Sequence, residues 1–269
     1  MTTTLQSAPA QVATRARAPI APVPLARLVK IELRKMFDTR SGFWLMAGIA
    51  ITALCATAAV LMWGSDSQVS QETFSAAIGM PMAVLLPVIA VLSVTSEYSQ
   101  RTALSTFTLV PHRGRIISAK LVAVLLVGIA SMLLSLVVGA LGTVLGGAVH
   151  GVDPVWGLTL ESFALICLAN VLGMLMGFML GVVTRNSPAA IVGYFVYSLV
   201  LPGVAGMLAM YQQWFADAQP WIDPNQNITL LFDVTPDAKG WVQLATSTAL
   251  CLWLPLALGV RALLRAEVK

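Results

Sequence analysis

The ionisable residues of this 269-residue chain are few, and their types limit the chemistry that the chain can carry. Only 10% of the residues are Asp, Glu, Lys or Arg, and the two histidines, His112 and His150, lie far apart. The sequence contains no GxxxxGKS or GxxxxGKT loop for nucleotide phosphates, no HExxH zinc motif and no GxSxG nucleophile. We therefore expect no catalytic site, metal or cofactor on this chain, which by itself is not an enzyme.

The densest cluster of charged residues spans positions 97–120. Charged side chains surround a short apolar strip there, and a proline follows the strip; the residues are Glu97, Arg101, Thr102, Leu104, Phe107, Pro111, Arg113 and Lys120. This pattern predicts a short amphipathic helix that stops at the proline. A partner protein can bind such a helix, but on the residues alone an ordinary basic loop explains the pattern better.

A second cluster, at positions 24–40, precedes the first apolar run. One side of a helix over these residues is basic, with Arg27, Lys30 and Arg34, and the other side is apolar, which is typical of a helix lying in the membrane interface. Glu32 falls within the apolar side, where an unpaired carboxylate is costly. It therefore needs a cation, either from a cytoplasmic loop or neighbouring helix or from Lys35, three residues further on.

Six long apolar runs must position these clusters. The chain is 58% hydrophobic, and about twenty helical residues span a hydrocarbon core. The runs are 43–63, 74–96, 121–149, 162–184, 188–211 and 241–260. The sequence thus predicts an all-α integral membrane protein, with a disordered cytoplasmic tail at 1–23, an amphipathic interfacial helix at 24–40 and a six-span domain at 41–265. The third run is long, so it tilts or its glycine-rich end leaves the helix.

The distribution of Lys and Arg predicts the orientation of the six spans. Seven precede the first run, four lie between the second and third, one lies between the fourth and fifth, and three follow the sixth. Only Lys239 falls on the other side, where most acidic residues lie. Because the cytoplasmic side of a membrane protein carries the excess of positive charge, we expect both termini in the cytoplasm. Basic residues clustered between apolar runs also argue against nucleic-acid binding.

The apolar runs contain no Asp, Glu, Lys, Arg or His. Ion-coupled carriers, voltage sensors and intramembrane hydrolases use such residues at membrane depth. Their absence makes an ion-coupled secondary transporter a weak alternative. If the protein moves a solute uphill, another chain must supply the energy.

The 97–120 segment resembles the permease subunits of type-2 ABC exporters. In that family the second span ends in Glu, a short helix containing Thr follows, a Pro with a nearby Arg comes next, and a Lys leads into the third span. The matching positions are Glu97, Thr102, Pro111, Arg113 and Lys120. The chain departs from the family at Arg101, where many members have Gly.

Two further segments agree with this resemblance, which covers about 25–265. The Glu32-Leu33-Arg34-Lys35 element is similar to the Glu-Leu-x-Lys element of the family's interfacial helix, and the external segment 212–240 is similar to the place where members carry short re-entrant or interfacial helices. The resemblance implies that 97–120 is a coupling helix that docks on an ABC ATPase subunit. It also implies ATP and Mg on that partner chain and a pathway between two permease copies, in a homo- or heterodimer.

Small residues and prolines within the runs predict close packing and bends. Gly173, Gly177 and Gly181 form a ridge that favours helix packing within one subunit over a dimer interface. Prolines interrupt the second, fifth and sixth runs as kinks or hinges, at Pro81, Pro87, Pro202 and Pro255.

The expected function is that of a permease subunit of an ATP-driven exporter in the plasma membrane, and a prokaryotic cytoplasmic membrane fits best. Runs without ionisable residues favour an amphiphilic or apolar substrate such as a drug, lipid or peptide. The alternative is a membrane scaffold or sensor subunit that transports nothing.

Overall fold

The computed structural model describes residues 23–66, 69–99 and 113–265, and this part of the chain contains helices and no strands. Six of its helices are long and apolar enough to cross a membrane. They are Gly42–Trp63, Gln71–Ser99, Gly114–His150, Leu160–Thr184, Ser187–Tyr211 and Ala238–Arg265. The predicted all-helical fold with six candidate spans is therefore confirmed. Most of the predicted tail and the strip between positions 100 and 112 lie outside the described residues.

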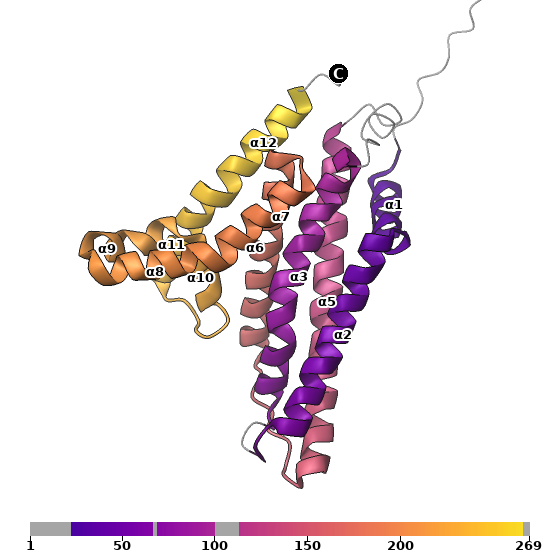
Figure 1. Cartoon of the computed structure of the whole chain (residues 1–269), viewed down its shortest axis with the longest axis vertical. Helices are drawn as coiled ribbons and strands as arrows, with labels where there is room; N and C mark the ends of the chain where they lie inside the picture. The colour runs from indigo at the N-terminus through magenta and orange to yellow at the C-terminus, as the bar shows by residue number, and fades with distance from the viewer. Residues whose placement is uncertain (1–22, 67–68, 100–112, 266–269) are drawn as a thin grey trace, which may run out of the picture.

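Four long helices run side by side along the molecule (Figure 1). They are α2 (Arg40–Trp63), α3 (Gln71–Ser99), α5 (Arg113–His150) and α6 (Leu160–Thr184). A short amphipathic helix, α1 (Leu25–Asp38), packs beside one end of α2 and α5. Thr39 separates α1 from α2: its backbone is extended, and its hydroxyl accepts a 3.2 Å hydrogen bond from the Gly42 N–H, which caps the new helix.

The helices extend further than the apolar runs. Helix α3 continues to Ser99 and α5 begins at Arg113, so Glu97, Arg113 and Lys120 belong to flanking helices. The glycine-rich end of the third run also stays helical, up to His150. The turn comes at Gly151, whose φ of +68° suits glycine.

The fifth and sixth spans each contain one π-helical turn. The fifth consists of α7 (Ser187–Phe195), η2 (Val196–Val200) and α8 (Leu201–Tyr211), and the sixth of α11 (Ala238–Thr248), η3 (Ala249–Trp253) and α12 (Leu254–Arg265). In both spans the π turn ends two residues before a proline, Pro202 or Pro255. A proline has no N–H and clashes with the carbonyl four residues earlier, so a locally wider helix relieves the conflict.

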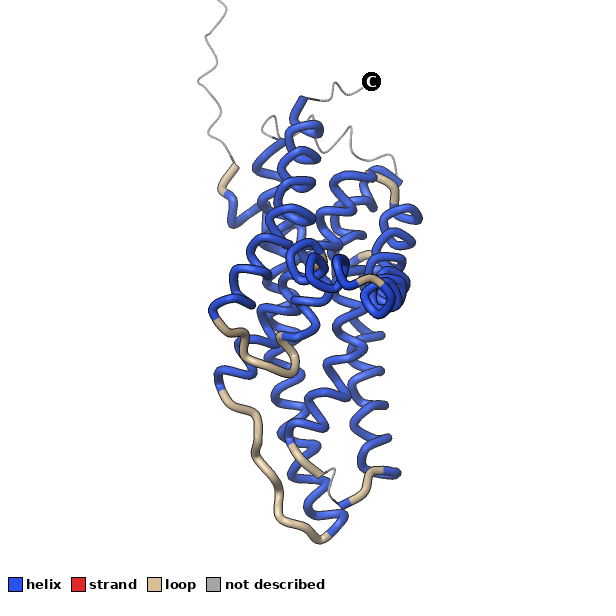
Figure 2. The backbone as a smooth tube through the Cα atoms, turned by 90° about the vertical axis from the view of Figure 1, so that its left-hand side faces the viewer, coloured by secondary structure: helices blue, strands red, loops and turns tan. Residues whose placement is uncertain are grey.

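Two short helices connect these spans, as expected for 212–240. Helix α9 (Gln213–Ile222) packs on α11, and α10 (Pro224–Leu230) follows Asp223, which caps it. The amide of Asn227 donates to the Pro220 carbonyl at 2.7 Å and to the Ser247 hydroxyl at 2.9 Å, which ties the connection to the sixth span. In Figure 1 these helices lie beside the middle of the long helices rather than beyond their far ends, and Figure 2 shows the same arrangement from the side.

The glycine ridge of α6 packs against α3 within the same chain, as the sequence favoured. A Cβ atom on Gly177 would collide with the backbone carbonyl of Pro87, and one on Gly181 would lie 3.1 Å from the Val91 carbonyl. Gly173 faces the ring of Pro87. The ridge therefore lets the proline-containing part of α3 approach α6 closely.

Candidate functional site

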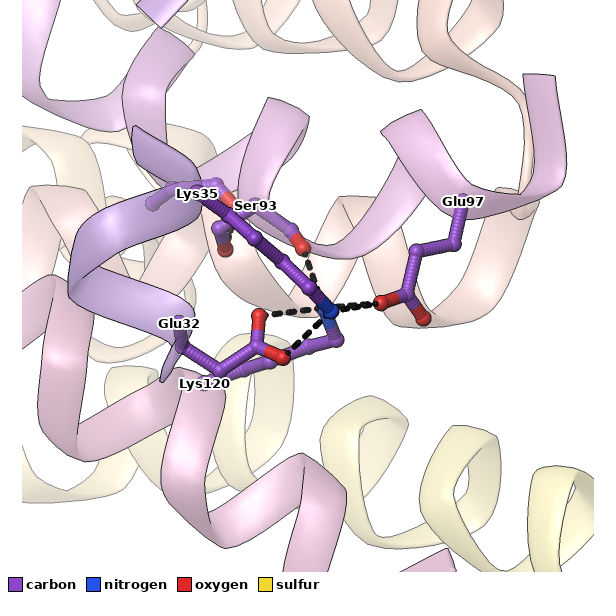
Figure 3. Close-up of polar contacts among 6 residues, drawn as sticks. Glu32, Lys35, Ser93, Glu97 and Lys120 are labelled. Carbon is purple, nitrogen blue, oxygen red and sulfur yellow. Dashed lines mark hydrogen bonds and ion pairs between the residues drawn. The ribbon is translucent and has the colours of Figure 1, made fainter. Parts of the chain in front are cut away.

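Four charged residues from three helices meet where α1, α3 and α5 converge (Figure 3). Glu32 and Lys35 come from α1, Glu97 from the last turn of α3 and Lys120 from the third turn of α5. They lie at the end of the molecule that carries α1, the start of α5 and the end of α12, the upper end in Figure 1, which we call the basic end.

These four residues form a closed ring in which each lysine bridges both glutamates, and we call it the ion ring. The Lys35 ammonium lies 2.8 Å from a carboxylate oxygen of Glu32 and 2.8 Å from one of Glu97. The Lys120 ammonium lies 2.7 Å from Glu32 and 3.0 Å from Glu97. It also donates a 3.0 Å hydrogen bond to the Ser93 carbonyl. The ring is therefore neutral overall.

The ion ring is largely shielded from solvent. Glu32, Glu97 and Lys120 are 6%, 7% and 5% exposed, and Lys35 is half-buried. Burial alone lowers the pKa of Lys35, but the hydrogen bonds and charges of Glu32 and Glu97 outweigh it, so this pKa is raised above its ordinary value. Lys35 is thus charged at neutral pH, and its stabilising effect is lost only as the pH rises through this raised pKa.

The structure resolves the alternatives for Glu32, because both kinds of partner are present. Lys35 supplies the local pair, and Lys120 supplies the cation from a neighbouring helix. The required cation for Glu32 is therefore confirmed. The other basic residues of α1 do not join the ring: Arg27 and Lys30 are exposed, and Arg34 pairs with Asp38 on the exposed face at 2.9 Å.

The remaining residues of the 97–120 cluster are placed in part. Arg101, Thr102, Leu104, Phe107 and Pro111 lie outside the described residues. The backbone of Arg113 begins α5. The structure therefore fixes the two ends of the connection at 100–112, and the ion ring joins these ends to each other.

A chain of hydroxyl groups ties the same end of α3 to the fifth span. The Ser187 hydroxyl donates to Thr95 at 2.8 Å and lies 2.8 Å from the Ser99 hydroxyl. Asn186 caps α7 by accepting from the Ala189 N–H. The short loop before the fifth span is thus bound directly to the last turns of α3.

Sequence reasoning missed the pairing of Glu97 with Lys120. Glu97 directly follows the second apolar run and Lys120 directly precedes the third. Charged residues at such positions usually face solvent. The signal was present in Glu32, because a carboxylate on the apolar side of α1 demands a cation from the bundle, and Lys120 is the basic residue next to the third run.

The described residues contain no group of three His, Cys, Asp or Glu side chains able to hold a metal ion. Three helices are joined by charge-assisted hydrogen bonds, directly beside the connection at 100–112.

Comparison with known proteins gives the family. No curated protein matches the chain. A family model described as "ABC-2 family transporter protein" matches residues 28–201, well over half of the chain, and this span contains the whole ion ring. The chain therefore belongs to the ABC-2 family of transporter membrane proteins, as a multi-pass permease subunit, and this membership implies association with ABC ATPase partners.

Proposed function

We propose that this chain is the permease subunit of an ATP-driven exporter and that the connection at 100–112, with its flanking helix ends, is the part that couples it to a separate ATPase. The observation that carries this proposal is the ion ring. It fastens both ends of the connection to each other and to α1, so that a force on the connection reaches three helices together.

The coupling step follows from this geometry. Closure of two ATPase subunits around ATP and Mg displaces the connection at 100–112. Because Glu97 and Lys120 join the ends of α3 and α5, these helices move as one body, and α1 follows through Glu32 and Lys35. The hydroxyl chain at Ser187 passes the displacement to the fifth span. In this proposal the basic end of the molecule faces the cytoplasm throughout.

The substrate pathway lies between two permease copies in this proposal. Helix α8 has no buried residue, and its apolar side chains, such as Val204 and Met207, are 57% and 63% exposed in the single chain. Such a face contacts lipid or a second copy. In the described spans, Asp, Glu, Lys, Arg and His occur only near helix ends, which favours an amphiphilic or apolar substrate.

The proposal is tested with a candidate partner ATPase, which is sought in neighbouring reading frames by its Walker A motif. The wild-type chain should co-purify with this ATPase from membranes. The double variant Leu104→Glu with Phe107→Glu should lose the ATPase, because both side chains belong to the apolar strip that the sequence predicts as the docking surface. Its unfolding temperature is measured in parallel, so that a loss of binding is separated from a loss of folding.

The matched control is Trp214→Glu, an equally drastic change on α9, where the side chain is 66% exposed. This variant should retain the ATPase. If the double variant retains both the ATPase and ATP-driven transport in proteoliposomes, the coupling assignment is wrong. Glu97 is unsuited to this test, because its replacement disturbs the fold as well as the docking segment.

A further inference from the structure

A small cavity lies inside the bundle, where α3, α5 and α6 pack against one another away from the ion ring. Its walls include Ser75 and Met82 of α3, Met132 and Ser135 of α5, and Asn170 of α6. Because α3 ends at the basic end, the position of Ser75 near the start of α3 places the cavity toward the opposite end of the molecule. All three helices are candidate membrane spans, so the cavity belongs to the membrane-spanning bundle.

Two polar atoms at this cavity, the Ser75 hydroxyl oxygen and Asn170 Oδ1, are buried and have no hydrogen-bond partner within residues 23–66, 69–99 and 113–265. Asn170 is 4% exposed, and its amide nitrogen donates to the Ile166 carbonyl at 2.9 Å. Because a carbonyl only accepts, this bond identifies the nitrogen of the amide and leaves Oδ1 as the atom that needs a donor. Buried polar atoms of this kind are costly unless a partner satisfies them.

The polar side chains around the cavity come from three different helices. The Ser75 hydroxyl faces α5, because a Cβ atom added to Gly139 would lie 3.1 Å from its oxygen. Ser135, about one turn before Gly139 on α5, also lines the cavity, and Asn170 lines it from α6. A ligand in this space would therefore contact all three helices.

We propose that this cavity binds one or two water molecules, which hydrogen-bond Ser75 to Asn170 and so link α3 to α6. The cavity has a volume of about 30 Å³. A buried water needs roughly 10 to 15 Å³ and two to four polar partners, so one or two fit. A water donates to Asn170 Oδ1 and can donate to or accept from the Ser75 hydroxyl, so it satisfies both atoms. The lining residues carry no charge that would balance a metal ion.

The proposed water differs from the ion ring as a link between helices. At the basic end, Glu97 of α3 and Lys120 of α5 bond directly at 3.0 Å. A bridging water gives nearly as good a bond, but it can turn and bond again when its partners move. The opposite half of the bundle can therefore keep its buried polar atoms satisfied while the helices shift.

The test is X-ray footprinting of the full-length protein in lipid nanodiscs. An X-ray pulse converts water into hydroxyl radicals, which oxidise nearby methionines to the sulfoxide, and mass spectrometry measures the product at each residue. Met82 and Met132 line the cavity and are each 3% exposed, yet both should gain sulfoxide in the wild-type chain. Met176 and Met179 of α6 are 2% and 6% exposed, lie outside the cavity lining and should stay unoxidised.

The variant Ser75→Ala with Asn170→Leu removes both unpartnered atoms and nearly preserves the shape of the cavity, which then becomes apolar and dry. Oxidation of the two cavity methionines should be lost. Thr143→Val is the matched control. Thr143 is fully buried on α5, but its hydroxyl already donates to the Gly139 carbonyl at 2.9 Å, so this variant should retain the oxidation.

The proposal is overturned if the cavity methionines of the wild type are as protected as Met176 and Met179, a comparison that requires no variant to fold. It is also overturned if the double variant unfolds at the temperature of the wild type and still shows the oxidation, because the radicals then form elsewhere. An equal loss of oxidation in Thr143→Val would overturn it as well, since the effect would not depend on the two cavity atoms.

Discussion

A carboxylate buried in a membrane bundle is tolerable only when cations and hydrogen bonds surround it, and the ion ring satisfies this condition twice. Glu32 and Glu97 each contact both lysines at 3.0 Å or less. Removing one member leaves two like charges sharing a single counter-ion, and the resulting excess of buried charge is far more costly than the loss of an exposed pair.

Lys120→Met should therefore destabilise the protein strongly, by roughly 3 to 5 kcal/mol in the free energy of unfolding. The measurement is the thermal unfolding of the detergent-solubilised chain. Arg34→Met is the matched control, because its pair with Asp38 is exposed and should contribute less than about 1 kcal/mol. Equal shifts for the two variants would show that the ion ring does not hold the helices together.

For the ion ring, the sequence predicted that Glu32 requires a cation, but it did not predict that Glu97 completes the ring. Glu32 on the apolar side of α1 required a cation, and the structure supplies Lys35 and Lys120. The partnership of Glu97 was not predictable, because it depends on the distance between two helices that are separated in the sequence by the connection at 100–112. No pattern in a single sequence fixes that distance.

Among the helices, the junction of α3 with α6 and α7 is organised around Pro87. Because a proline lacks an N–H, the carbonyl of Ala83, four residues earlier, loses its helical partner. The hydroxyl of Tyr194, on α7, donates to this carbonyl at 3.0 Å. The fifth span thus supplies the hydrogen-bond donor that the proline removes from the second span.

Tyr194→Phe should destabilise the protein by about 1 to 3 kcal/mol, because it leaves the Ala83 carbonyl unpaired in an apolar setting. In the background of Pro87→Ala the same change should cost less, since the alanine N–H restores the helical bond. Thermal unfolding of the four proteins of this double-mutant cycle gives the coupling energy.

Tyr197→Phe is the control for this cycle. The buried Tyr197 hydroxyl has no hydrogen-bond partner within the described part of the chain, so its removal should leave stability nearly unchanged. If Tyr194→Phe lowers the free energy of unfolding equally in the two backgrounds, the hydrogen bond from Tyr194 to the Ala83 carbonyl does not compensate for the proline.

The close packing of the α6 glycine ridge against the backbone of Pro87 gives a further prediction. Gly177→Ala should destabilise the chain by about 1 to 3 kcal/mol, because the new Cβ collides with the Pro87 carbonyl and pushes α3 away from α6. Gly206→Ala is the control: a Cβ there meets no atom within 4 Å, and alanine favours the helix. Thermal unfolding in which Gly206→Ala costs as much as Gly177→Ala would contradict the tight α3–α6 packing.

The ends and irregular turns of the helices were predictable from the sequence only in part. The prolines predicted irregular spans, and π turns stand before Pro202 and Pro255. Their type was not predictable, because kinks and π turns both relieve the same clash. The helices also run past the apolar residues, with α3 ending at Ser99 and α5 beginning at Arg113. Glu97 and Lys120, which flank the apolar runs, pair with each other within these helices.

For the whole molecule, apolar runs alone were sufficient to predict the fold class. Six runs of about twenty residues can satisfy their backbone groups in a bilayer only as helices, and six candidate spans are present. The position of α9 and α10 beside the bundle was left open by the sequence, since polar and apolar residues alternate in 212–240. Contacts such as that of Asn227 with Ser247 decide it.

The central claim, that the connection at 100–112 couples this permease to an ATPase, is tested most directly by crosslinking. A photoreactive phenylalanine analogue is placed at Phe107 or, as a control, at Trp221 on α9, and cells expressing the chain with its neighbouring ATPase are irradiated. Our account predicts a crosslink to the ATPase from position 107 and none from position 221. No crosslink from position 107, while the ATPase still co-purifies, would contradict the account.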